Sequence, residues 1–140
     1  MLLISHRGNI NGPDVESENH PNYIKNALLK GFHVEIDVWF QDDVFLLGHD
    51  YPAHKINEPF LENEKLWCHA KNLNALEKML QNPKIHCFWH QEDDFSITSK
   101  GYIWTYPKKQ TCSKSILVVK DNKDFKALNC FGICSDFLLI

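Results

Sequence analysis

Two histidines, an arginine and two carboxylates early in the chain have the types and spacings that suit chemistry on a phosphate ester. His6 and Arg7 follow a short apolar stretch, and His49 follows a second one. Glu35 and Asp37 lie between these two points in an apolar, β-branched setting. Imidazoles exchange protons near neutral pH, and carboxylates bind metal ions. The combination therefore indicates metal-assisted acid–base chemistry on a phosphoryl group.

The two carboxylates are expected to form a metal site. Side chains two residues apart on a strand point to the same side, so Glu35 and Asp37 converge while their apolar neighbours pack the other face. Two converging carboxylates repel each other unless a cation lies between them, and oxygen ligands suit Mg²⁺ or Ca²⁺. The alternative is a pair of solvated acids on an edge strand. The flanking residues are too apolar for an exposed face, which favours the metal site.

The two histidines are candidates for proton transfer. His6 ends a short apolar strand, where β/α folds place catalytic residues, and its unperturbed pKa suits acid–base work. Arg7 can hold phosphate oxygens through two parallel hydrogen bonds. His49 closes a second apolar run. A lone histidine is more often structural than catalytic, but two at strand ends around an acid pair favour function.

The bulk properties indicate one soluble globular domain over residues 1–140. The chain is 44% hydrophobic and 24% charged, with a net charge of −3, which is ordinary for such a domain. No dense cluster of Lys and Arg indicates binding to nucleic acid or a membrane surface. Neither a signal peptide nor a transmembrane run is recognisable. Five cysteines without a CxxC pair favour reduced thiols and a cytoplasmic location.

Alternating strand and helix patterns predict an α/β fold. Eight apolar segments have the length of strands: residues 2–5, 33–38, 44–47, 66–70, 85–89, 102–106, 115–119 and 131–135. Several are continuous apolar runs, as in a parallel sheet. Three helices are expected: one from Pro21 to Gly31, one from Asn74 with a Glu77 capping box, and one from residue 121 or 122 to 128. Residues 107–114 leave little room for another. We therefore expect a reduced (β/α) barrel of the TIM type with part of its outer helical layer missing.

The order of the motifs resembles a known family. Four elements carry the resemblance: His6-Arg7-Gly8, Glu18-Asn19, Glu35-Ile36-Asp37-Val38 and Gly48-His49-Asp50. Together they resemble the glycerophosphodiester phosphodiesterase family, in the barrel superfamily that includes phosphatidylinositol-specific phospholipase C and the spider-venom sphingomyelinases D. The resemblance is strong over residues 4–50. It is fainter at Lys71, at residues 103–105 and at residues 132–136.

This resemblance implies a phospholipase C-like barrel that cleaves a small glycerophosphodiester-like substrate with a divalent metal ion. It also implies a role for each matched residue: His6 and His49 as the acid–base pair, Glu35 and Asp37 as metal ligands, and Arg7 and Lys71 as phosphate contacts. Two further residues are candidate substrate contacts. Trp104 has a family counterpart beside the pocket, although an aromatic residue on a buried strand more often serves packing than recognition. His90 lies in an unusual segment that could line the mouth of the pocket, and a core Trp89 with a solvated acidic loop explains that segment equally well.

Two departures from the family pattern matter. The family has a third carboxylate where this chain has His69, and imidazole suits Mn²⁺, Zn²⁺ or Fe²⁺ better than Mg²⁺ or Ca²⁺. His69 is therefore a ligand for a softer metal, a contact behind the ligands, or a sign of weakened metal binding. The chain is also much shorter than a TIM barrel of about 250 residues. Its uncovered flanks predict a homo-oligomer, most simply a dimer.

Two functions from different classes remain. The first is a metal-dependent phosphodiesterase, which either hydrolyses its substrate or stops at a cyclic phosphate. The second is a catalytically inactive reduced barrel that binds a phosphorylated ligand or a protein partner. The missing third acid and the short chain support the second. The presence of both histidines, the acid pair, Arg7 and Lys71 supports the first.

Overall fold

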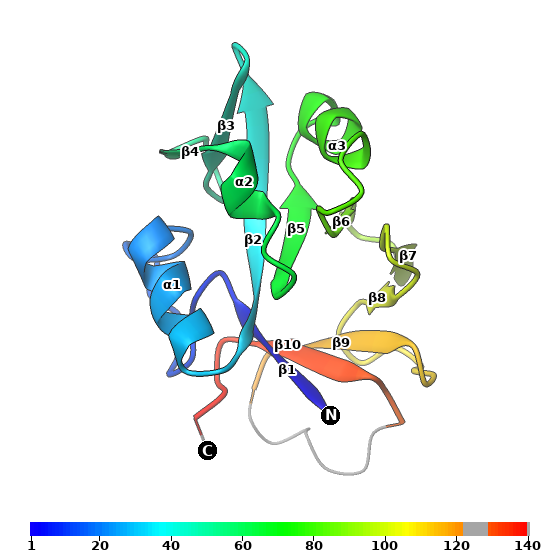
Figure 1. The fold of residues 1–140 in the computed structure, drawn as a ribbon. Coiled ribbons are helices and arrows are strands. Elements are labelled where there is room, and N and C mark those ends of the chain that lie inside the picture. The colour runs from blue at the N-terminus through cyan, green and yellow to red at the C-terminus, as the bar shows by residue number, and fades with distance from the viewer. Residues whose placement is uncertain (122–128, 140) are drawn as a thin grey trace.

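The chain folds into one strongly curled sheet with helices packed against part of it (Figure 1). This computed structural model describes residues 1–121 and 129–139. The described elements, in chain order, are β1 (Leu2–His6), α1 (Pro21–Leu29), β2 (His33–Gln41), β3 (Val44–Leu47), β4 (His54–Ile56), α2 (Glu58–Leu61), β5 (Leu66–Ala70), α3 (Leu73–Leu80), β6 (Cys87–Phe88), β7 (Phe95–Ile97), β8 (Ile103–Thr105), β9 (Ser115–Val119) and β10 (Gly132–Ser135).

Parallel pairing dominates the sheet. The main path runs β4-β3-β2-β1-β10-β9-β8-β7, and β5 and β6 branch from β2. Strand β2 is parallel to both β1 and β5, while the hairpin strand β3 runs antiparallel to its far end. The hairpin turns at Asp42 and Asp43, whose φ angles of 51° and 61° suit the tight turns that join twisted strands. The long β2 therefore borders β1, β3 and β5, the strands that carry or precede the histidines at positions 6, 49 and 69.

The predicted TIM-type barrel is wrong. The described residues form a curled, mixed half-barrel with three helices, and no ladder joins β6 to β8 within them. An antiparallel hairpin of β7 and β8 follows β6, and residues 106–114 join the parallel strands β8 and β9 without a helix. These connections are too short to cross the sheet through a helix, so the outer layer does not form there.

Helices lie where the two longer connections allow them. Helix α1 carries β1 to β2 and begins at Pro21, after His20, whose side chain accepts a hydrogen bond from the Asn22 N–H. Helix α3 carries β5 to β6, and its cap is Asn72, which accepts from the Ala75 N–H. The start predicted near Asn74 was therefore late. The third predicted helix falls largely on residues 122–128, outside the described residues.

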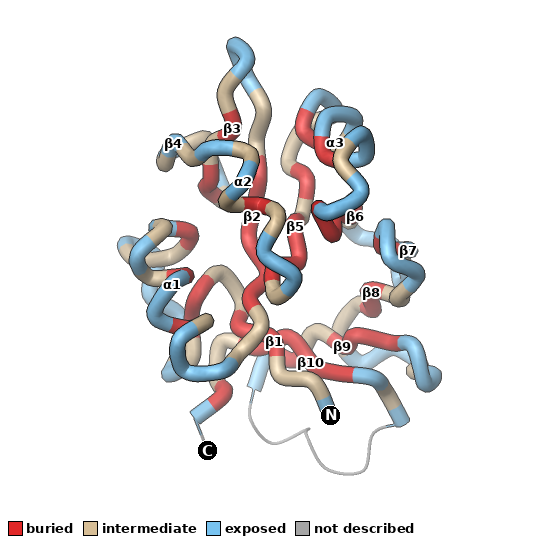
Figure 2. Tube along the Cα trace, in the orientation of Figure 1, coloured by how far each residue is buried: buried red, intermediate tan, exposed pale blue. Residues whose placement is uncertain are grey.

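Buried residues concentrate on the central strands (Figure 2), and apolar clusters lie on both faces of the sheet. On the outer face, apolar residues of β2 and β5 pack against α1 and α3. Inside the curl, a second cluster is built from residues of six strands: Ile4, Trp67, Phe88, Trp104, Ile116 and Cys134. Because side chains alternate along β2, its outward residues are apolar while Glu35 and Asp37 point inward above this second cluster. The fold therefore buries two carboxylates inside the curl.

Side chains join β6 to the β7–β8 hairpin in place of a ladder. His86 Nε2 lies 2.7 Å from Thr98 Oγ1, and the Ser99 N–H donates to the Cys87 carbonyl at 2.8 Å. His86 is buried and packs on the Trp67 ring. Burial, aided by the charge of Lys100, lowers the pKa of His86 to about 4. His86 is therefore neutral in the folded protein at neutral pH.

This buried histidine predicts a loss of stability in mild acid. In the unfolded chain His86 takes up a proton near pH 6.5, whereas the folded chain resists protonation until about pH 4. The stabilisation is therefore complete above pH 6.5 and is lost as the pH falls towards 4. Between these pH values the free energy of unfolding should fall by about 3 kcal/mol more in the wild type than in His86→Phe. Urea unfolding at both pH values measures this, and equal losses in the two proteins would contradict it.

Candidate active site

A tight turn after β1 presents the first two functional residues. Arg7 and Gly8 have φ angles of 60° and 96°, and a Cβ on Gly8 would lie 2.5 Å from the Tyr23 ring. Only glycine fits there. The Arg7 N–H donates to the Glu35 carbonyl at 2.9 Å. The turn therefore places the side chains of His6 and Arg7 over the inward carboxylates of β2.

Asp37 is the centre of the cluster. Its Oδ2 lies 3.2 Å from Arg7 Nε and 3.4 Å from His49 Nδ1, and its Oδ1 lies 3.3 Å from His69 Nδ1. Its side chain is only 1% exposed. Burial alone would raise the pKa of Asp37, but the contacts with His49, His69 and Arg7 hold it well below its usual range. Asp37 is therefore a buried carboxylate ion surrounded by cationic or proton-donating groups.

Asn19 fixes the orientation of Asp37. The Asn19 amide Nδ2 donates to Asp37 Oδ2 at 2.9 Å, and its Oδ1 accepts from the Asp37 backbone N–H at 2.9 Å. Asn19 is 1% exposed and has a φ of 63°, a left-handed conformation that asparagine tolerates better than most residues. The Glu18-Asn19 motif of the sequence therefore positions a carboxylate.

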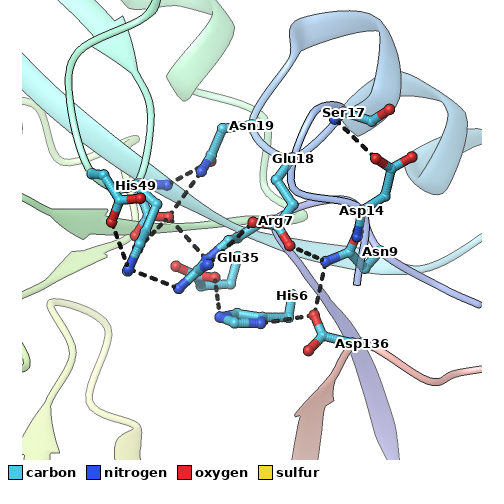
Figure 3. A network of polar contacts seen from close by, with 12 residues as sticks. His6, Arg7, Asn9, Asp14, Ser17, Glu18, Asn19, Glu35, His49 and Asp136 are labelled. Carbon is cyan, nitrogen blue, oxygen red and sulfur yellow. Dashed lines mark hydrogen bonds and ion pairs between the residues drawn. The ribbon is translucent and has the colours of Figure 1, made fainter. Parts of the chain in front are cut away.

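Arg7 is held by carboxylates on two sides (Figure 3). Besides its contact with Asp37, its Nη1 donates to Glu18 Oε2 at 3.1 Å, and its Nη2 lies 3.3 Å from His49 Nε2. Burial lowers the pKa of Arg7, but the charges of Glu35 and Asp37 and the bond to Glu18 outweigh it and raise that pKa. The guanidinium is a fixed positive charge beside the second histidine.

His6 is oriented by Asp136, which follows β10. His6 Nδ1 lies 2.9 Å from Asp136 Oδ1, and His6 Nε2 lies 3.7 Å from Glu35 Oε2. Asn9 Nδ2 donates to the same Asp136 oxygen at 2.8 Å (Figure 3). Burial lowers the pKa of His6, but the bond to Asp136 and the charge of Glu35 outweigh it, so that pKa is raised. This arrangement leaves Nε2 as the exchangeable nitrogen.

His69 faces the opposite side of the acid pair. Its Nδ1 lies 3.3 Å from Asp37 Oδ1 and 3.7 Å from Glu35 Oε1, and its Nε2 lies 2.8 Å from the carbonyl of His90. Burial lowers the pKa of His69, but its contacts with Asp37 and Glu35 outweigh burial and raise that pKa to about 9. A metal ion that bound here would displace the Nδ1 proton.

The donor set and its unpaired atoms fit a divalent cation. Glu35, Asp37 and His69 each offer one ligand atom, and these three atoms lie within 4.8 Å of one another. Among the described residues, Glu35 Oε2 and Asp37 Oδ1 are buried without a hydrogen-bond partner. Buried polar atoms normally have partners. The two carboxylates and one imidazole are therefore arranged as a cation site would require.

A cavity of about 600 Å³ opens beside the cluster. Residues from three of the motifs line it, together with Tyr51 and the residue after β10: His6, Arg7, Glu18, His49, Tyr51 and Asp136. The cavity is large enough for a small substrate. Both histidines and the arginine therefore face one space.

Three other candidate residues lie elsewhere. Trp104 packs in the inner core, 4.4 Å from the Phe88 ring centroid, and His90 contributes its carbonyl while its ring bonds to the Asp93 carbonyl. Lys71 follows His69 by two residues, and within the described residues no hydrogen bond or ion pair joins its side chain to the cluster. Lys71, His90 and Trp104 do not line the cavity.

Sequence reasoning missed Asp136 and Asn9 as functional residues and took Glu18 only as part of a motif. Asn9 Nδ2 donates to both Glu18 and Asp136, so this trio supports Arg7 and His6 from behind. One signal could have identified Asp136. It is a carboxylate directly after an apolar strand, at the same edge of the sheet as His6.

Comparison with protein-family models, curated proteins and solved structures found no match. No helix among the described residues has the length and apolar character needed to span a lipid bilayer.

Asn19 offers a direct test of the cluster's architecture. Asn19→Ala removes both hydrogen bonds to Asp37 and places alanine at positive φ, and should lower the free energy of unfolding by about 2–4 kcal/mol. Asn19→Gly loses the same bonds but tolerates the backbone conformation, so it should be the less destabilised of the two. Chemical denaturation measures both variants. A wild-type value for Asn19→Ala would mean that Asn19 does not hold Asp37.

Proposed function

We propose that the protein is a metal-dependent phosphodiesterase that acts on a small glycerophosphodiester-like substrate, an alcohol–phosphate–alcohol compound. One observation carries this proposal. His6 and His49 come from the ends of different strands, contact the same buried acid pair and line the same cavity. Breaking a phosphodiester requires one proton acceptor and one proton donor on either side of the phosphorus atom, and two imidazoles supply them.

The histidines perform the proton transfers at defined atoms. His6 Nδ1 is held by Asp136 and His49 Nδ1 faces Asp37, so each ring exchanges protons at Nε2. One imidazole accepts the proton of the attacking hydroxyl, from water or from the substrate itself, as the new O–P bond forms. The other donates a proton to the alcohol oxygen as the old P–O bond breaks. One imidazole gains the proton that the other loses, and exchange with solvent restores both. Apart from the attacking hydroxyl, the reaction needs no other reactant.

Positive charge stabilises the phosphoryl oxygens during this exchange. A divalent ion held by Glu35, Asp37 and His69 would act as a Lewis acid toward those oxygens. Arg7 adds a fixed positive charge at the cavity wall, and its Nη atoms can donate hydrogen bonds to a phosphate. Its contacts with Glu18 and Asp37 position it before the substrate arrives.

One observation favours the alternative, a catalytically inactive protein that binds a phosphorylated ligand or a protein partner. All three side-chain nitrogens of Arg7 already face groups of the protein. A guanidinium engaged in this way has fewer donors left for a phosphate. The alternative predicts binding of a phosphorylated ligand without turnover.

Turnover is the decisive measurement. The protein should cleave a glycerophosphodiester or a chromogenic bis-aryl phosphate when Mg²⁺, Ca²⁺ or Mn²⁺ is supplied separately. Phosphorus NMR distinguishes a monoester product from a cyclic phosphate. His6→Ala and His49→Ala should each lower the rate by at least about 100-fold, the usual scale for acid–base catalysis. His20→Ala is the matched control, because His20 is an exposed helix cap that does not line the cavity.

Two results would count against the proposal. Mild effects of both alanine substitutions would mean that these histidines are not the acid–base pair. Binding of inorganic phosphate or a phosphomonoester in the cavity, with no turnover under any metal, would favour the non-catalytic alternative.

A homodimer and a cytoplasmic location belong to the same proposal. The described helices cover only part of the sheet, and on β7 the side chains of Phe95 and Ile97 are 51% and 78% exposed. A second copy of the chain would cover apolar surface of this kind. Light scattering at micromolar concentration should therefore give the mass of a dimer, and a purely monomeric protein would contradict the prediction.

A further inference from the structure

We infer that His69 makes the metal site select Mn²⁺, Zn²⁺ or a similar transition-metal ion over Mg²⁺ and Ca²⁺, and that Phe88 and the His90 carbonyl hold its ring for this role. The inference rests on the metal site of the proposed function and names the class of ion that the site would take. Three observations support it: His69 Nδ1 faces the acid pair, its Nε2 faces the His90 carbonyl, and its ring stacks on Phe88.

The acid pair divides its oxygens between two sets of histidines. His69 Nδ1 faces Glu35 Oε1 and Asp37 Oδ1. His6 and His49 instead face the other oxygen of each carboxylate, Glu35 Oε2 and Asp37 Oδ2. His69 therefore lies apart from the two histidines assigned to proton transfer. Its Nδ1 lies on the side of the pair away from them, and one ligand atom each from Glu35, Asp37 and His69 lie within 4.8 Å of one another.

The His90 carbonyl fixes which nitrogen can bind a metal. His69 Nε2 lies 2.8 Å from this oxygen. An oxygen at that distance accepts a hydrogen bond, so Nε2 must carry a proton. When His69 is neutral, its lone pair is consequently on Nδ1, aimed at the acid pair. Metal-binding histidines commonly donate their second N–H to a backbone carbonyl in this manner.

Phe88 fixes the plane of the same ring. The two rings stack with centroids 5.1 Å apart and an interplanar angle of 9°. Phe88 is 2% exposed, and in the inner core its ring also stacks on the Trp104 ring. A ring held on one face and at one nitrogen cannot easily turn away. His69 is therefore a preorganised ligand rather than a mobile side chain.

A donor set of one imidazole and two carboxylates has a definite preference. Mg²⁺ and Ca²⁺ are hard ions that take oxygen ligands. Imidazole instead favours the first-row transition metals and Zn²⁺. With His69 Nδ1 as the third donor, the site lacks the third carboxylate charge that would favour the hard ions.

Metal binding by the isolated protein tests this inference without any substrate. Metal-free wild type, His69→Asp and His20→Asp are titrated calorimetrically with MnCl₂, ZnCl₂, MgCl₂ and CaCl₂ in turn. Pulsed electron paramagnetic resonance of the Mn²⁺ samples detects a directly bound imidazole nitrogen. His20→Asp makes the same substitution at an exposed cap, and it also disrupts the surface pair with His54, whose ring lies 4.9 Å away.

The expected result is specific to His69. Wild type and His20→Asp bind Mn²⁺ and Zn²⁺ more tightly than Mg²⁺ and Ca²⁺ and show the nitrogen signal. His69→Asp loses that signal and gains affinity for Mg²⁺ and Ca²⁺. Equal affinities of the wild type for all four ions, or a nitrogen signal that persists in His69→Asp, would overturn the inference. A signal lost in His20→Asp would assign the metal to the surface histidines instead.

The role of Phe88 is tested by a substitution that leaves every ligand in place. Phe88→Leu removes the stacked ring and should weaken Mn²⁺ binding by roughly 10- to 100-fold, as is typical for residues that support a ligand. Ile116→Val, in the same inner core, controls for loss of packing. Equal Mn²⁺ affinities in the two variants would remove Phe88 from the inference.

This result is independent of turnover. Selective binding of Mn²⁺ or Zn²⁺ without phosphodiester cleavage would leave the inference standing and refute the proposed enzyme. Cleavage supported equally by Mg²⁺ and Mn²⁺, with equal binding of both ions, would do the reverse.

Discussion

Repulsion between two buried carboxylates on one strand is the constraint on which the rest of this structure depends. Glu35 and Asp37 are 2% and 1% exposed, and a buried charge without a partner is far too costly to persist. Groups from three parts of the chain lie close enough to stabilise the two carboxylates. Arg7 approaches from the turn after β1, His49 from the end of β3, and His69 from β5. Each element of the site therefore also supplies a positive charge or a proton donor to the pair.

The half-barrel can form the site without closing, because four neighbouring strands carry the residues of the site. Strands β10, β1, β2 and β5 are consecutive parallel neighbours, and their carboxyl ends lie at one edge. Parallel strands bring such ends together whether or not the sheet closes. The β6–β8 gap lies on the other side of the curl, where His86 and Thr98 bridge it. The described residues form no helix there, and the site does not depend on one.

The sequence predicted local features well and global closure badly. Each of the eight predicted strands overlaps an observed one, because continuous apolar runs are a local signal. The convergence of Glu35 and Asp37 followed from alternation along one strand. The barrel did not follow, because closure depends on connection lengths and distant pairings. The short strands β4 and β7 carry exposed or half-exposed residues and give little apolar pattern. Asp136 depended on the pairing of β1 with β10, a contact between the two ends of the chain.

The buried polar atoms of the cluster that lack hydrogen-bond partners are unusual for a core that is shaped for stability alone. Four buried atoms of the described residues lack a hydrogen-bond partner: Arg7 Nε, Glu35 Oε2, Asp37 Oδ1 and His49 Nδ1. Each such atom costs about 1–3 kcal/mol. A core shaped for stability alone would avoid that cost with apolar residues of similar volume. Local conflicts of this kind are expected where a fold serves chemistry. Three of the four atoms still face an opposite charge or a proton donor within 3.4 Å, because Arg7 Nε and His49 Nδ1 lie beside Asp37 Oδ2 and His69 Nδ1 lies beside Asp37 Oδ1. Under the proposed function, a metal ion would be the missing partner of the two carboxylate oxygens.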